Sequence, residues 1–144
     1  MIRLFLIFCM FAPALVGANE LKPFTSDGCS AFPNGSFDHN ELWLECCHTH
    51  DSSYWRGGSY NERVKADKDL EACVRQVGEP EIALLMLAGV RVGGTPFLPT
   101  SFRWGYGWNY PRFYGELTPN ELLQVERFTK ASAIKPKTPA STGF

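Results

Sequence analysis

Residues 46–54 read CCHTHDSSY, in which two adjacent cysteines precede a His-Asp pair and a tyrosine. An α-helix turns once in about 3.6 residues, so side chains four apart share a face. That spacing runs through the stretch at Leu42, Cys46, His50 and Tyr54. Asp38 with Glu41 three residues later matches a capping box. We therefore expect a helix over residues 39–56.

A second helix is predicted directly after the first. Gly57 and Gly58 interrupt the helical pattern, and Ser59 with Glu62 forms another capping box ahead of apolar residues at helical spacing. We expect this helix over residues 60–77. A link this short gives the second helix little freedom to lie elsewhere, so we expect the two helices to be antiparallel, with their inner faces in contact.

The middle of the chain is rich in apolar and aromatic residues. Pro80 is a favoured first residue of a helix, and residues 82–88 are apolar all round, which predicts a third, buried helix. Residues 97–114 are expected to be extended or looped with one aromatic face, because aromatic residues alternate there. These rings either cover the core or dock at a membrane surface, and the sequence favours the core slightly.

The two ends of the chain have different expected roles. Residues 1–18 resemble a secretory signal, with an apolar run too short to span a bilayer and small residues before an expected cleavage after Ala18. Residues 19–131 are expected to form one domain. Its last helix is predicted over residues 119–131, since Thr118 and Glu121 form a third capping box, and residues 132–144 are predicted to be a disordered tail.

Four cysteines remain once the signal is removed: Cys29, Cys46, Cys47 and Cys73. An even number in a small exported domain predicts two disulfides, because an oxidising compartment favours them and a small core needs the help. Adjacent cysteines cannot bond each other without straining the peptide, which leaves two possible pairings. A zinc site is disfavoured, since adjacent cysteines lack the usual ligand spacing. We expect the protein to be secreted, either outside the cell or into a periplasm.

The charge pattern excludes one class of partner. The chain has 14 Lys and Arg residues against 15 Asp and Glu residues, with a formal net charge of −1. The basic residues form no run or stripe, so we expect no nucleic-acid partner. We also expect a monomer.

The residues that can carry chemistry lie on the two predicted helices and the loop before them. If the helices are antiparallel, Asp67 can reach His50, and a carboxylate on one imidazole nitrogen leaves the other nitrogen as a base. Asp51 and Asp27 are hard oxygen ligands, and the loop around Gly28 can turn main-chain carbonyls toward the same ion. Calcium accepts such mixed ligands and can stabilise the oxyanion of an ester in hydrolysis.

Three segments resemble the secreted calcium-dependent phospholipases A2, and among them the small microbial type. Their order along the chain is also that of the family. The first is the stretch at residues 46–54, with paired cysteines, His-Asp and Tyr at the spacing of that family. The second is Asp67, six residues before Cys73. The third is Asp27-Gly28-Cys29-Ser30 followed by residues 32–35, which is similar to the calcium loop of microbial members. The resemblance covers roughly residues 27–74.

The resemblance implies a fold and a set of roles. The fold would be mainly α, a small disulfide-linked phospholipase A2-like fold with two antiparallel catalytic helices. His50 would activate a water against the sn-2 ester of a glycerophospholipid at a membrane or micelle surface, Asp67 would orient the imidazole, and Tyr54 would hydrogen-bond Asp67. Calcium would be bound by Asp51, by the Gly28 carbonyl and by Asp27. The disulfides implied are Cys29–Cys47 and Cys46–Cys73.

The sequence is also compatible with two other functions. One is a catalytically silent phospholipase A2-like module that binds lipid or protein. The other is an interaction domain or toxin that engages a partner through its aromatic segment.

Overall fold

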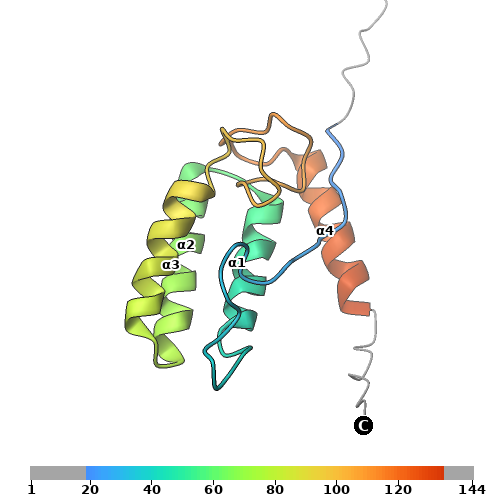
Figure 1. Ribbon diagram of the computed structural model, residues 1–144. Helices are drawn as coiled ribbons and strands as arrows, with labels where there is room; N and C mark the ends of the chain where they lie inside the picture. Colours follow the sequence, from blue (N-terminus) through green and yellow to red (C-terminus); the bar gives the residue numbers. More distant parts are fainter. Residues whose placement is uncertain (1–18, 135–144) are drawn as a thin grey trace, which may run out of the picture.

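The structure is a computed structural model that describes residues 19–134, with side chains described through residue 131. This part of the chain contains four helices and no strands: α1 (Leu44–Arg56), α2 (Tyr60–Gln76), α3 (Pro80–Gly93) and α4 (Pro119–Ile134). Helices α1, α2 and α3 lie side by side, and the segment between α3 and α4 crosses one end of them (Figure 1). The mainly α class is confirmed. The predicted signal lies outside the described residues.

Helix α1 begins five residues later than predicted, and the Asp38–Glu41 capping box is wrong. Its N-cap residue is Trp43, which makes no side-chain capping bond. The Trp43 indole instead donates to the Pro33 carbonyl at 2.7 Å, and its amide donates to the Asn34 carbonyl at 3.1 Å. These bonds hold the chain before Leu44 against the preceding loop, so it forms turns rather than helix.

The other two predicted capping boxes are present. The Ser59 amide donates to the Glu62 carboxylate at 2.7 Å, and the Thr118 amide donates to Glu121 at 2.8 Å. Helix α2 ends at Gln76, one residue before the predicted end. Helix α4 continues to Ile134, so the first three residues of the predicted disordered tail are helical. Residues 135–144 of that tail lie outside the described residues.

Three cross-links establish that α1 and α2 are antiparallel, as predicted. From one end to the other, these are the Cys46–Cys73 disulfide, the His50–Asp67 contact and the Tyr54–Arg63 hydrogen bond. The residue numbers rise along α1 while they fall along α2. The inner faces of the two helices therefore meet, and their facing residues include the candidate chemistry.

Helix α3 is present, but the prediction that it is buried is wrong. Only Ala83 and Met86 of this helix are buried, and the side chains of Leu84 and Leu85 are 54% and 57% exposed. The reason is that α3 packs closely against α2 alone, and no other described helix makes extensive contact with it. An apolar run was therefore a poor guide to how many sides of the helix are covered.

The aromatic segment fills the core at the end of the helices, although it forms turns rather than extended strands. Trp104 and Trp108 are fully buried, and their indoles donate to the Gly58 and Arg56 carbonyls at 2.9 and 2.7 Å. For these two rings the core interpretation is confirmed. Four other large rings of the segment are exposed: Phe97, Phe102, Tyr110 and Phe113.

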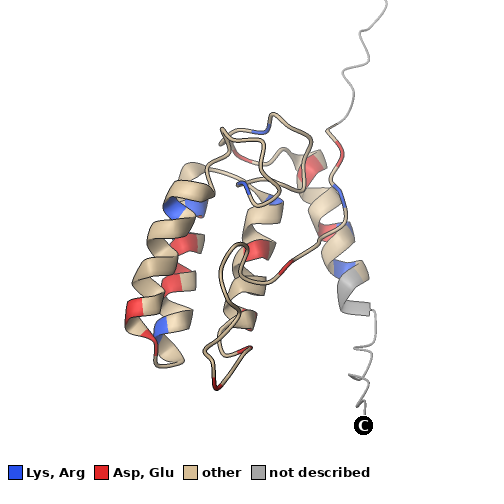
Figure 2. Cartoon of the chain, in the orientation of Figure 1, with Lys and Arg blue, Asp and Glu red and all other residues tan. Residues whose placement is uncertain are grey.

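The described surface carries both signs of charge. Acidic and basic positions both occur along the helices (Figure 2). None of the helices within residues 19–134 combines the length and apolar character needed to cross a bilayer.

Candidate functional site

A buried histidine forms the centre of the candidate site. The His50 side chain is 7% exposed, and its Nε2 lies 3.1 Å from Oδ1 of Asp67, which is 0% exposed. The Tyr54 hydroxyl donates to the same carboxylate oxygen at 2.7 Å. The structure thus brings together the three residues predicted for catalysis. Within the described residues, the second imidazole nitrogen, Nδ1, has no hydrogen-bond partner.

Tyr54 is fixed in its protonated form. Burial raises the pKa of its hydroxyl, and the negative charge of Asp67 raises that pKa further. A neutral hydroxyl can donate to the carboxylate, whereas a phenolate would repel it. Tyr54 therefore acts as a fixed donor that orients the carboxylate toward His50.

Two arginines that the sequence analysis missed surround Asp67. The Arg91 Nε lies 2.8 Å from Asp67 Oδ2, an ion pair that lacks the alignment of a hydrogen bond. The Arg63 Nε donates to the Tyr54 hydroxyl at 3.1 Å and lies 3.9 Å from Asp67 Oδ2. Arg63 also donates to the Val90 and Arg91 carbonyls of α3 at 2.8 and 2.9 Å. The carboxylate is therefore a junction between α1, α2 and α3.

The sequence offered a signal for one of these arginines only. Arg63 precedes Asp67 by four residues, so the two share a face of α2 and an ion pair between them is expected. Arg91 lies on a different helix, and its contact depends on how α3 packs. No local pattern predicts that packing.

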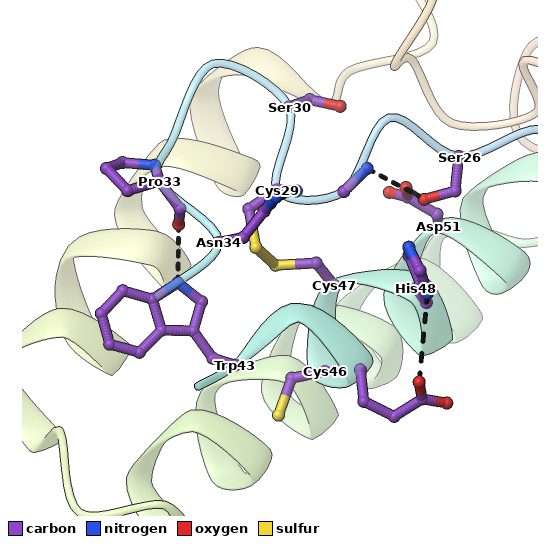
Figure 3. The surroundings of a disulfide bond; sticks show 12 residues. Ser26, Cys29, Ser30, Pro33, Asn34, Trp43, Cys46, Cys47, His48 and Asp51 are labelled. Atoms are coloured by element: carbon purple, nitrogen blue, oxygen red, sulfur yellow. Dashed lines mark hydrogen bonds and ion pairs between the residues drawn. A yellow bond between two sulfur atoms is a disulfide. The ribbon is translucent and has the colours of Figure 1, made fainter. Parts of the chain in front are cut away.

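The loop of residues 26–30, which we call the acidic loop, lies next to the histidine. The Ser26 hydroxyl donates to Asp51 Oδ2 at 2.6 Å and accepts from the Gly28 amide at 3.2 Å. Figure 3 shows this loop passing over α1, with Ser26 beside Asp51. The Ser30 hydroxyl donates to Asp27 Oδ1 at 2.6 Å. The Gly28 carbonyl accepts from the Ser30 amide at 3.1 Å, which leaves one lone pair on that oxygen for another partner.

The surroundings of Asp51 disfavour its negative charge. Burial raises the pKa of the Asp51 carboxyl above its ordinary value, the Ser26 hydrogen bond lowers it, and the nearby Asp27 carboxylate raises it. The same two carboxylates raise the pKa of Tyr106, after the larger effect of burial. A cation between Asp27 and Asp51 would relieve their mutual repulsion.

The donor set for such a cation consists of two carboxylates with hydroxyl and carbonyl oxygens. Within residues 19–134, no group of three or more His, Cys, Asp or Glu side chains converges as a metal cluster. Asp27 and Asp51 line one hollow, and Gly28 and Asp51 line the adjoining one, so the three predicted ligand residues are neighbours. Hard oxygen donors of mixed type are the ligands that calcium accepts.

Two disulfides hold these elements in place. The bonds are Cys29–Cys47 and Cys46–Cys73, the pairing that the resemblance implied. The first fastens the acidic loop to α1, and the second fastens α1 to α2 (Figure 3 shows the first). Because the two α1 cysteines are adjacent, the loop and α2 are both anchored one turn before His50.

A groove opens beside the histidine. It has a volume of about 400 Å³, and its walls come from residues 28–32, from helices α1, α2 and α3, and from Phe102. We call it the apolar groove, since its walls include Phe32, Leu70, Leu85, Met86, Val90 and Phe102. His50 and Asp51 also line it. A second, more polar hollow of about 240 Å³ contains Asp27, Ser26 and Ser101 and shares Asp51 with the groove.

Comparisons with protein-family models, curated proteins and solved structures find no match for this chain.

Proposed function

We propose that this protein is a secreted calcium-dependent phospholipase of the A2 type, which hydrolyses the sn-2 ester of glycerophospholipids. One observation carries the proposal. The buried imidazole of His50 contacts the Asp67 carboxylate through Nε2, and its Nδ1 has no partner among the described residues. The same imidazole lies beside the acidic loop and lines the apolar groove. A general base, a place for a divalent cation and a place for a hydrocarbon chain therefore adjoin one another.

His50 would act as the general base. Asp67 accepts from Nε2, which fixes the tautomer and leaves the Nδ1 lone pair to take a proton from water. When the imidazole becomes charged, the buried carboxylate stabilises it. Tyr54 keeps Asp67 in place through its own hydrogen bond to the same oxygen.

The acidic loop fits calcium by the chemistry of its donors. Asp51, Asp27 and the Gly28 carbonyl supply hard oxygens, and both burial and the Asp27 charge raise the pKa of Asp51, so a cation beside it would be favoured. When bound, calcium would polarise the ester carbonyl and stabilise the negative charge that develops on its oxygen. Asp51 follows His50 directly, so the residues that would hold the ion and the base share one turn of α1.

The apolar groove would take an acyl chain. Its volume of about 400 Å³ is within the range of small-molecule sites, roughly 300–1,000 Å³. Hydrocarbon in the groove would bring the ester beside His50, since that residue lines the same wall. A phospholipid presented at a membrane or micelle surface matches this combination of a charged headgroup region and an apolar slot.

The direct test is release of fatty acid from phosphatidylcholine vesicles over a calcium titration, with and without a chelator. We expect hydrolysis that needs calcium and is lost in His50→Gln and Asp51→Asn. The matched control is His48→Gln, because His48 is on the same helix but partly exposed and bonded to neither Asp67 nor the loop. A fully active His50→Gln variant that retains its helical content would refute the proposed base.

Binding measurements beside the hydrolysis assay separate the alternatives. Calcium-dependent binding to vesicles without turnover would favour the catalytically silent module. Binding to a partner that survives chelation would favour the interaction domain.

A further inference from the structure

Two glycines of α3 line the apolar groove. Gly89 and Gly93 are one helical turn apart, so they lie on the same face of the helix, and both contribute to the groove wall. Glycine weakens a helix interior relative to alanine, because it loses more backbone freedom on folding. Their presence in α3 therefore calls for a compensating reason.

Backbone conformation is not that reason. The glycines with positive φ are others: Gly28, Gly57, Gly58, Gly78 and Gly105. At Gly89 and Gly93 the helix has ordinary dihedral angles, which any L-residue other than proline can adopt.

Close packing is not the reason either. A Cβ added at Gly89 would meet no atom within 4 Å, and one added at Gly93 would meet only Phe102, at an ordinary contact distance of 3.7 Å. The neighbouring Gly94 is different, since a Cβ there would clash with the Tyr54 ring. Gly94 is needed for packing, whereas a Cβ would fit at Gly93, which is half-buried in the groove, and at Gly89, which is exposed at its edge.

The space that they leave leads to the candidate base. A stripe of small residues alone indicates no ligand, but an independent feature lines the same groove. The His50 side chain is more than nine-tenths buried, and its Nδ1 has no partner among the described residues. The empty side of α3 and the free nitrogen therefore belong to one groove. Because a Cβ at Gly93 would point toward Phe102, the space lies between α3 and that ring.

We propose that Gly89 and Gly93 keep the groove wide enough for a long acyl chain between α3 and Phe102, and so determine the chain-length preference of the enzyme. The inference rests on the proposed function. The eight-residue distance from Leu85 to Gly93 corresponds to about 12 Å of helix, so the open wall extends over two turns. A side chain at either glycine would narrow the groove part of the way along.

The test compares a long-chain and a short-chain phosphatidylcholine, dipalmitoyl and dihexanoyl, presented in the same mixed detergent micelles with calcium. Gly93→Leu should lower the ratio of long-chain to short-chain kcat/KM by about tenfold or more, since a difference of a single methylene in a pocket can discriminate to that degree. Gly93→Ala and Gly89→Leu should give smaller decreases. The control is Val92→Leu on the same helix, whose side chain is 79% exposed and should leave the ratio unchanged.

The outcomes separate the inference from the function on which it rests. Hydrolysis by all variants with an unchanged chain-length ratio would overturn the inference and leave the function standing. Absence of hydrolysis by the unmodified protein would refute the function. In that case, binding of palmitate measured by calorimetry decides the inference: binding weakened by Gly93→Leu but not by Val92→Leu supports it, and equal or absent binding overturns it. Gly93→Ala serves the same comparison if the leucine variant does not fold.

Discussion

Replacement of Asp67 by asparagine should destabilise the protein strongly, although the two side chains have the same shape. The asparagine would keep an oxygen that can accept from Tyr54 and His50, so the hydrogen bonds at Oδ1 are preserved. The change removes the negative charge and replaces Oδ2, an acceptor that faces Arg91 and Arg63, by an amide NH2 that can only donate. Arg63 and Arg91 would then be left beside a neutral group.

The magnitude follows from the burial of the three charges. Removal of one partner of a buried ion pair costs about 3–5 kcal/mol, because the other charge is left uncompensated. Asp67 is 0% exposed and the Arg63 side chain is almost as buried, but the Arg91 side chain is 32% exposed and can be partly hydrated. The Arg91 contact is also poorly aligned. We therefore expect a loss near the lower limit, about 3 kcal/mol in the free energy of unfolding.

A double-mutant cycle would show how much of the stability lost in Asp67→Asn comes from the uncompensated charge of Arg91. Arg91→Met keeps much of the length of the side chain and leaves Asp67 with Arg63 as its remaining cation, so it should cost about 2 kcal/mol. In the double variant Asp67→Asn/Arg91→Met, neither charge is stranded by loss of the other. We expect its cost to fall below the sum of the single costs by about 1–2 kcal/mol.

The assay is urea unfolding monitored by tryptophan fluorescence, with calcium removed and the disulfides intact. Equal m-values across the four proteins would show that the unfolding transitions are comparable. A cost of less than about 1 kcal/mol for Asp67→Asn, or single costs that add to within about 0.5 kcal/mol in the double variant, would show that Asp67 and Arg91 are not coupled in this way.

Three further predictions concern other parts of the protein. Because the pKa of Asp51 is raised above its ordinary value of 3.8, the folded state binds more protons than the unfolded state between those two pKa values, so in chelator the stability should fall as the pH rises through that window. Asp51→Asn should remove this part of the pH dependence. If the free energy of unfolding of Asp51→Asn, measured from acidic to neutral pH, changes with pH as it does in the unmodified protein, the prediction is wrong. Replacement of both Cys46 and Cys73 by serine should lower the free energy of unfolding by about 2–5 kcal/mol, measured by urea unfolding against the unmodified protein. Ser59→Ala should cost about 1 kcal/mol through loss of the α2 cap, and a melting temperature equal to that of the unmodified protein would contradict it.

Features that depend on neighbouring residues were predictable from the sequence. The capping boxes that begin α2 and α4 are made within four residues, so the pattern and the structure coincide. The antiparallel pair followed from a link too short for another arrangement. The meeting of His50 with Asp67 then followed from that pairing. The disulfide connectivity was different, because the residues alone allowed two pairings and only the family resemblance chose between them.

Features that depend on distant contacts were not predictable. Asp38 and Glu41 match the capping-box pattern, but no helix begins there, because Trp43 is hydrogen-bonded to the loop at Pro33. The ion pair of Arg91 with Asp67 depends on the packing of α3, which no local pattern specifies. The exposure of Leu84 and Leu85 likewise depends on how many elements cover α3. The hydrophobicity of the sequence does not specify that number.

The C-terminal end of α1 depends on a segment made much later in the chain. Its last carbonyls accept hydrogen bonds from backbone and indole groups of the aromatic segment: Gly105 to Tyr54, Gly107 to Trp55, and Trp108 to Arg56. During synthesis, the helix that carries His50 leaves the ribosome well before these donors, since Trp108 follows Arg56 by 52 residues. The last turn of α1 therefore lacks these donors until the aromatic segment has been made and has packed against it, and only then can the candidate site be complete.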